Sequence, residues 1–98
     1  MRFAIPIALL LATSPLLAKE AKGMKSKAAL AKTAKTDLAA ALGKATAKVP
    51  GKAVEVEIRK KKGKTVWEVE VLGDDGTMTE VDVDADSGEV VDTEGKSG

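Results

Sequence analysis

The sequence contains no cysteine, no histidine and no tyrosine, and it has one tryptophan and one phenylalanine. Without cysteine, the chain has no disulfide bond and no thiolate metal site. Without histidine, it lacks the usual general base, so its serines have no such base to activate them. It also lacks the aromatic groups that stack on bases beside lysines in nucleic-acid-binding proteins. We therefore expect no enzyme, no cofactor and no nucleic-acid partner.

The N-terminal segment 1–18 reads MRFAIPIALLLATSPLLA, which is one basic residue, an apolar run and a small residue at the end. This pattern predicts a secretory signal peptide that is cleaved after Ala18. The apolar run is too short for an ordinary transmembrane helix, and Pro6 and Pro15 interrupt it. The sequence thus predicts export to the periplasm or the medium, with no stable membrane anchor after cleavage. The alternative is an uncleaved anchor.

Charge divides the rest of the chain into two halves. Residues 19–64 contain fourteen Lys or Arg and four Asp or Glu, whereas residues 65–98 contain one and eleven. Segment 19–35 is rich in lysine and alanine, and the sequence leaves open whether it is helical. It can be read as a basic arm for an anionic surface or as a solvated linker, and the absence of bulky apolar residues favours the linker.

Residues 52–91 alternate between apolar and acidic side chains, which is the period of a half-buried β-strand. The first run presents Val54, Val56 and Ile58 on one face. The later runs present Trp67, Val69, Val71, Thr79, Val81 and Val83 on that face. The intervening positions form an acidic face, which we define as Glu55, Glu57, Glu68, Glu70, Glu80, Asp82 and Asp84.

The turns predict how these strands pair. A four-residue loop at 61–64 pairs Ile58 with Trp67, Val56 with Val69 and Val54 with Val71. A three-residue loop at 74–76, closed by glycine, pairs Val69 with Val81 and Trp67 with Val83. A similar loop at 86–88 brings Val91 opposite Val83. The prediction is a four-stranded antiparallel meander with one dry face and one acidic face, and with like charges opposite one another on the acidic face.

A helix precedes the strands. Thr36 is a suitable N-cap, Asp37 favours the first turn, and Pro50-Gly51 ends the helix. Its apolar stripe needs a surface, and the dry face of the sheet offers one. The predicted fold class is α+β, an N-terminal helix packed on one face of the meander. Its core comprises Leu38, Leu42, Val49, Val54, Val56, Ile58, Trp67, Val69, Val71, Val81, Val83 and Val91, within a domain at 36–92 followed by a flexible tail at 93–98.

The run from Thr36 to Val91 resembles the PepSY domain of bacterial extracytoplasmic proteins and of the propeptides of thermolysin-like metallopeptidases. The resemblance is carried by VPGKAVEVEI, VWEVEVLGDDG and EVDVDADSGEVV, in that order after an alanine-rich helix. It implies a non-catalytic module that binds another protein, with a peptidase as the partner to be inhibited, regulated or helped to fold.

The acidic face is the candidate binding site, because like charges opposite one another cost stability unless a cationic partner meets them. The structural alternative is that these acids only solubilise an open sheet face. A second functional interpretation is divalent-cation binding, since Asp82, Asp84 and Asp86 alternate like the first ligands of a calcium loop. The glycine and glutamate that should follow are absent: Ser87 and Thr93 occupy those places.

Overall fold

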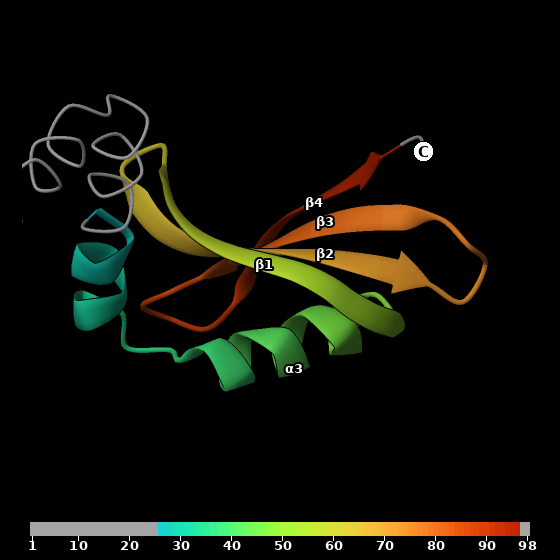
Figure 1. Cartoon of the computed structure of the whole chain (residues 1–98), viewed down its shortest axis with the longest axis horizontal. Coiled ribbons are helices and arrows are strands. Elements are labelled where there is room, and N and C mark those ends of the chain that lie inside the picture. The colour runs from blue at the N-terminus through green and yellow to red at the C-terminus, as the bar shows by residue number, and fades with distance from the viewer. Residues whose placement is uncertain (1–25, 97–98) are drawn as a thin grey trace, which may run out of the picture.

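The computed structural model describes residues 26–96, which form two helices followed by a four-stranded sheet (Figure 1). The predicted signal peptide and segment 19–25 lie outside this part of the chain. The first helix covers residues 26–33, and the second, α3, covers Leu38–Lys48. Neither helix is long and apolar enough to cross a membrane. The α+β class and the order of helix before strands are as the sequence predicted.

The N-cap of α3 is Asp37, whose carboxylate accepts a hydrogen bond of 2.9 Å from the backbone N–H of Ala40. The prediction of Thr36 was therefore one residue early. Thr36 lies in the bend between the helices, where its N–H donates to the carbonyl of Ala85. This bond ties the bend to the residue that follows the third strand. Residues 34–37 are not helical, so the two helices are separate elements and not one long helix.

Helix α3 lies across one face of the sheet and contacts all four strands (Figure 1). Its fully buried residues are Ala41 and Ala45, whose small side chains let the helix approach the strands closely. Leu42 and Val49 are half-buried beside them. Leu38, a predicted core residue, is 42% exposed because it stands in the first turn, at the edge of this contact. Leu30 of the first helix and Ala34, directly after it, pack against the same core.

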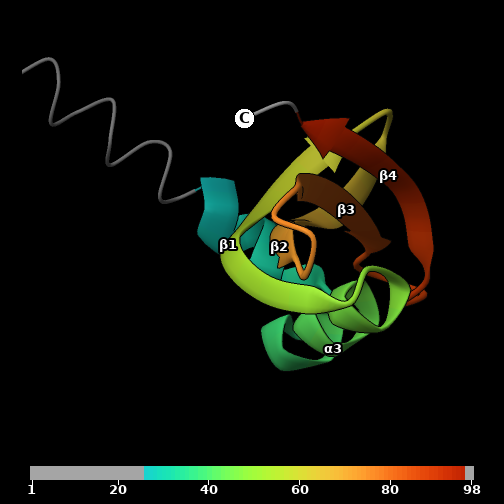
Figure 2. The same cartoon turned by 90° about the vertical axis from the view of Figure 1, so that its right-hand side faces the viewer.

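The strands are β1 (Gly51–Lys61), β2 (Lys64–Gly73), β3 (Met78–Asp84) and β4 (Val90–Lys96), in the order β1-β2-β3-β4. All neighbours are antiparallel, and the twisted sheet keeps α3 on one side (Figure 2). Strand β4 continues to Lys96, so residues 93–96, which the sequence assigned to the flexible tail, are part of the sheet. The dry face buries Ile58, Trp67, Val69, Val71, Val81 and Val83.

In the middle of the sheet, the pairing of β1 with β2 and of β2 with β3 agrees with the prediction. Ile58 pairs with Trp67 and Val56 with Val69, and β3 places Val83 and Val81 opposite the same two β2 residues. The hairpin between β1 and β2 is tighter than expected. Lys61 pairs with Lys64, and the two connecting residues, Lys62 and Gly63, both have positive φ angles (50° and 81°). Such a turn matches the twist of the strands and lengthens the hairpin without changing its register.

Two irregularities explain the predicted core residues that are exposed. A register shift between Ala53 and Glu55 places Ala53 opposite Val71, and Val54 is 52% exposed. The loop after β3 is also one residue longer than predicted, because the Asp84 N–H bonds to the Glu89 carbonyl. Val90, not Val91, therefore pairs with Val83, and Val91 is 49% exposed.

Candidate functional site

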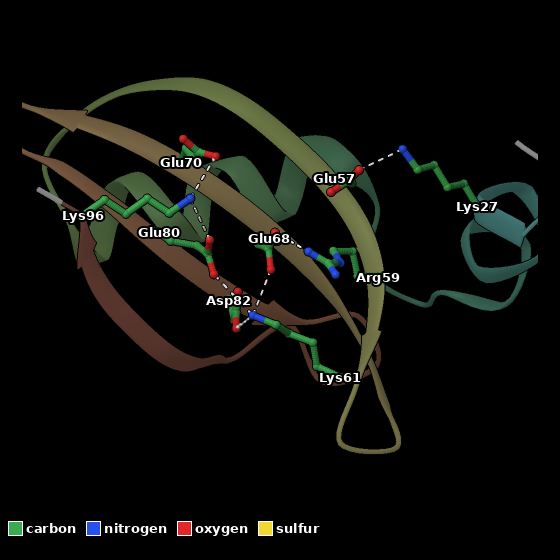
Figure 3. A network of polar contacts seen from close by, with 9 residues as sticks. All are labelled: Lys27, Glu57, Arg59, Lys61, Glu68, Glu70, Glu80, Asp82 and Lys96. Carbon is green, nitrogen blue, oxygen red and sulfur yellow. Dashed lines mark hydrogen bonds and ion pairs between the residues drawn. The ribbon is translucent and has the colours of Figure 1, made fainter. Parts of the chain in front are cut away.

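The acidic face lies on the side of the sheet away from α3 (Figure 3). Its acids meet as the alternation predicted. Glu68 on β2 has Glu57 on one side and Asp82 on the other. Glu70 in turn lies between Glu55 and Glu80. Like charges on adjacent strands therefore occupy directly opposed positions, which is unfavourable unless cations neutralise them.

Lys61 supplies one of these cations. Its side chain runs back from the hairpin end of β1 over the face of β2 (Figure 3). Its Nζ lies 2.8 Å from Glu68 Oε2, 3.0 Å from Asp82 Oδ2 and 3.3 Å from Glu80 Oε2. One ammonium is thus shared by three carboxylates from two strands. Because an ammonium carries three N–H donors, it can donate one hydrogen bond to each of them.

Lys96, near the end of β4, supplies a second cation from the opposite edge of the sheet. Its Nζ lies 3.1 Å from Glu80 Oε1 and 3.3 Å from Glu70 Oε2 (Figure 3). Arg59 adds a third, with its Nη1 at 3.4 Å from Glu68 Oε1. The acids in the middle of the face are therefore linked in one network with three cationic side chains of the same chain.

The network buries the acids that the sequence predicted to be bare. Only 11% of the Glu68 side chain, 12% of Glu80 and 7% of Asp82 is exposed. Lys61 and Arg59 therefore reach the middle of the face and not only its rim. The physical reason is that a long lysine side chain lies along the twisted hairpin and carries its charge across one neighbouring strand.

These contacts move the pKa values in different directions. Hydrogen bonds first to Glu68 and then to Asp82 raise the pKa of Lys61. Burial raises the pKa of Glu68, but Lys61 and Arg59 outweigh burial and the net shift is downward. For Asp82, burial outweighs the effect of Lys61, and its pKa is raised. Asp82 also has one carboxylate oxygen, Oδ1, that is buried without a hydrogen-bond partner. Asp82 is thus the acid least well accommodated in the charged form.

Glu68, Glu80 and Asp82 place carboxylate oxygens within 4.8 Å of one another, a spacing that could hold a metal ion. Oxygen ligands of this kind suit a hard cation such as calcium. However, the Lys61 ammonium contacts all three of these carboxylates, so a metal ion would have to compete with it. A lysine in this place offsets part of the negative charge of the carboxylates without any bound ion.

The calcium-loop candidates do not converge on one point. Asp84 Oδ1 accepts hydrogen bonds from the backbone N–H groups of Asp86 and Ser87, at 2.7 and 3.1 Å. These bonds lower the pKa of Asp84. Asp84 is therefore the residue that caps the loop. Asp86 is exposed, and among residues 26–96 it belongs to no group of acids close enough to hold a metal ion.

Two predicted acids lie at the β1 side of the face. Glu57 forms an ion pair of 2.9 Å with Lys27 of the first helix (Figure 3). Glu55 is exposed and has no ion-pair partner in the 26–96 region.

Sequence reasoning missed Val66, which is buried on the same face as the acids, opposite Asp84. Val66 and Val91 line an open hollow of about 540 Å³ between the hairpin end and β4, together with Lys61, Lys62, Lys64, Asp82 and Asp92.

A comparison with protein-family models shows to which family the chain belongs. Residues 26–94 match the family model described as peptidase propeptide and YPEB domain, known as PepSY. The chain belongs to the PepSY family. The match includes the first helix, the Pro50-Gly51 pair, the loop capped by Asp84 and most of β4. Comparisons with curated proteins and with solved structures gave no match. A PepSY domain is consistent with a non-catalytic peptidase-propeptide or regulatory module.

Proposed function

We propose that this PepSY protein is an exported, non-catalytic module that binds a peptidase and regulates it. The observation that carries the proposal is the family match over residues 26–94, since the family is described by its occurrence in peptidase propeptides. The signal-like segment 1–18 supports a place outside the cytoplasm, where such peptidases act. The partner class is a metallopeptidase whose own propeptide carries a domain of this kind.

The arrangement of the acidic face argues against catalysis. General acid–base chemistry needs a titratable group that reaches a substrate with its proton available. Here Glu68, Glu80 and Asp82 are bound by the Lys61 ammonium and shielded from solvent, so they are poorly placed to exchange a proton with a substrate. The sequence offers no histidine or cysteine to replace them. Because its central acids already have cations of their own, the face is a poorer docking surface for a cationic partner than the sequence suggested.

The test uses the purified exported chain and a purified thermolysin-like metallopeptidase. We expect a saturable change in the hydrolysis of a peptide substrate, or an increased recovery of peptidase activity when the peptidase is refolded with the chain. The control is Ala41→Asp, which buries a charge under α3 and unfolds the domain. A chain that changes neither readout, or that acts no better than Ala41→Asp, contradicts the proposal. Cross-linking in the cell envelope then identifies the natural peptidase.

Divalent-cation binding is the second candidate function, and the cluster of Glu68, Glu80 and Asp82 favours it. Because Lys61 competes for these oxygens, calcium titration calorimetry is needed on both the wild-type chain and Lys61→Met. Heat of binding in the wild type supports cation binding as a function. Heat in the variant alone shows that Lys61 excludes the ion, and its absence from both removes the candidate.

A further inference from the structure

Strand β4 forms one edge of the sheet, and no described element lies beside its outer side (Figures 1 and 2). We propose that this edge binds an extended segment of a partner protein that carries Lys or Arg at alternate positions. The segment would add a fifth strand to the sheet, a recognition mode in which backbone hydrogen bonds give affinity and alternate side chains give specificity. The inference rests on the proposed function as a protein-binding module and identifies the surface and the ligand chemistry.

The backbone directions show which groups of β4 are free. The Asp84 N–H bonds towards the β4 side, to Glu89, whereas the Ala85 N–H bonds towards β2, to Thr65. Because directions alternate along a strand, the N–H groups of Asp82 and Glu80 also face β4. Their partners Asp92 and Glu94 therefore face inward, and Thr93 and Gly95 between them direct their backbone groups outward. All of Val91–Lys96 is exposed, so a segment can reach these groups.

Charge determines what kind of segment fits. Asp92 lies opposite Asp82, and Glu94 lies opposite Glu80, so the acidic face continues onto the edge strand. The inner acids receive Lys61 and Lys96, whereas Asp92 and Glu94 have no ion-pair partner in the described chain. A strand added beside β4 places every second side chain next to these two carboxylates. Cationic side chains two positions apart would neutralise them as Lys61 neutralises the inner acids.

The other edge of the sheet is less suitable. Helix 26–33 approaches β1, where Lys27 pairs with Glu57, and the register shift after Ala53 makes that edge irregular. The end of β1 also carries three consecutive lysines, residues 60–62, which repel a cationic segment. Irregular and lysine-rich edges are the features by which proteins prevent strand addition. The edge of β4 has its own irregularity at Val91, but the stretch from Asp92 to Lys96 is in continuous register with β3.

Two synthetic peptides of identical composition test the proposal. In one, lysine and threonine alternate; in the other, the lysines are contiguous and the threonines follow. Both have the same net charge, so an unspecific attraction to the acids cannot distinguish them. We expect the alternating peptide to bind the purified chain about tenfold more tightly in fluorescence anisotropy, a difference of about 1.4 kcal/mol. Equal binding, or no binding of the alternating peptide, overturns the proposal.

Thr93→Pro tests the role of the backbone. Proline removes an outward N–H without breaking the ladder to β3, a position where edge strands tolerate it. We expect this variant to lose about tenfold in affinity for the alternating peptide, whereas Thr93→Ala, which keeps the N–H, binds like the wild type. Circular dichroism verifies folding. Binding by folded Thr93→Pro at wild-type strength overturns the proposal.

The double variant Asp92→Asn with Glu94→Gln tests the charge and is independent of how Thr93→Pro folds. We expect it to lose affinity for the alternating peptide and to show a weaker dependence on salt concentration. Unchanged affinity overturns the proposal. The proposed function is tested separately: if Thr93→Pro modulates the peptidase as the wild type does, the edge is not the contact and the peptidase role stands. If the wild-type chain binds the alternating peptide through β4 but never affects the peptidase, the β4 proposal stands and the peptidase role is contradicted.

Discussion

Lys61 on β1 and Asp82 on β3 are joined by a 3.0 Å ion pair that spans the whole width of β2. The strand between them contributes Glu68, whose carboxylate contacts the same ammonium. A single lysine thereby connects three strands on the face that α3 does not cover. This face is consequently an integral part of the fold, comparable to the apolar face although it is made of charges.

Lys61→Met should destabilise the domain. The substitution keeps an unbranched chain of similar length over β2 but leaves Glu68, Glu80 and Asp82 without their shared cation. Removing the partner of a shielded charge is costly, but Lys61 is partly exposed and water screens part of the effect, so we expect a loss of about 1–2 kcal/mol at neutral pH. Urea denaturation measures it. The loss should shrink at acidic pH, where protonation removes the repulsion among the carboxylates.

Lys60→Met is the matched control, because Lys60 is exposed and forms no ion pair in the described part of the chain. Its free energy of unfolding should stay within about 0.5 kcal/mol of the wild type. Equal effects at positions 60 and 61 would mean that total charge, and not the network, determines the stability.

Asp82 and Asp84 should show opposite pH dependence although they are two residues apart on one strand. Burial raises the pKa of Asp82 above that of an unfolded chain. Its contribution to stability is therefore fully present below the unfolded pKa, about 3.9, and is lost as the pH rises through the folded pKa. Backbone N–H groups of Ser87 and then Asp86 lower the pKa of Asp84. Its contribution is present above about pH 3.9 and is lost as the pH falls through the folded pKa.

The two isosteric substitutions should consequently differ in sign. At neutral pH, Asp82→Asn should increase the free energy of unfolding, because it removes a buried charge whose Oδ1 has no partner. Asp84→Asn should decrease it by about 1 kcal/mol, since hydrogen bonds to a charged acceptor are stronger than those to a neutral one. Denaturation at neutral and acidic pH measures both, and each difference should diminish on acidification. A shift of both variants in the same direction at neutral pH would contradict the burial of Asp82.

Trp67→Phe should cost about 1–2 kcal/mol. The indole Nε1–H of Trp67 donates a hydrogen bond of 2.8 Å to the carbonyl of Thr36, and phenylalanine leaves this carbonyl unpaired in the bend between the helices. Trp67 is the single tryptophan, so the wild type reports directly on the contact. The indole proton should exchange slowly with solvent in NMR spectra, and emission should shift to longer wavelength on unfolding. Rapid exchange in the folded protein would show that the bond to Thr36 is absent.

The sheet could be predicted from the sequence because two local features agree. Alternation assigns each side chain to a face, and Gly63 and Gly76 mark turns that keep this assignment across the strands. A shift of one residue would move the core valines of a strand to the acidic face. The opposition of Glu68 to Asp82 and the place of Trp67 in the core follow from the same register, and both were confirmed.

Other features depend on information that no local pattern carries. One extra residue in the loop capped by Asp84 exchanges Val91 for Val90, and glycine position alone does not determine loop length. The buried faces of Ala41 and Ala45 reflect how closely α3 approaches the sheet, which depends on the whole packed core. The shielding of the acids depends on the reach of Lys61 along a twisted hairpin. The pattern of charges placed these acids on one face but did not reveal that the chain neutralises them itself.

A pair of glycine substitutions should have opposite effects on stability. A Cβ at Gly51, where φ is +156°, would overlap the Leu72 carbonyl and lie 2.8 Å from Gly73 Cα, both backbone atoms of β2. Gly51→Ala must therefore displace the start of β1, and we expect a loss of about 2 kcal/mol or more. A Cβ at Gly43, on the exposed side of α3, meets nothing within 4 Å, so Gly43→Ala should gain about 1 kcal/mol from helix propensity. Thermal denaturation of both variants measures the contrast. Equal stability of the two variants would show that β1 does not approach β2 so closely at Gly51. The glycine after Pro50 would then serve only the turn that ends α3.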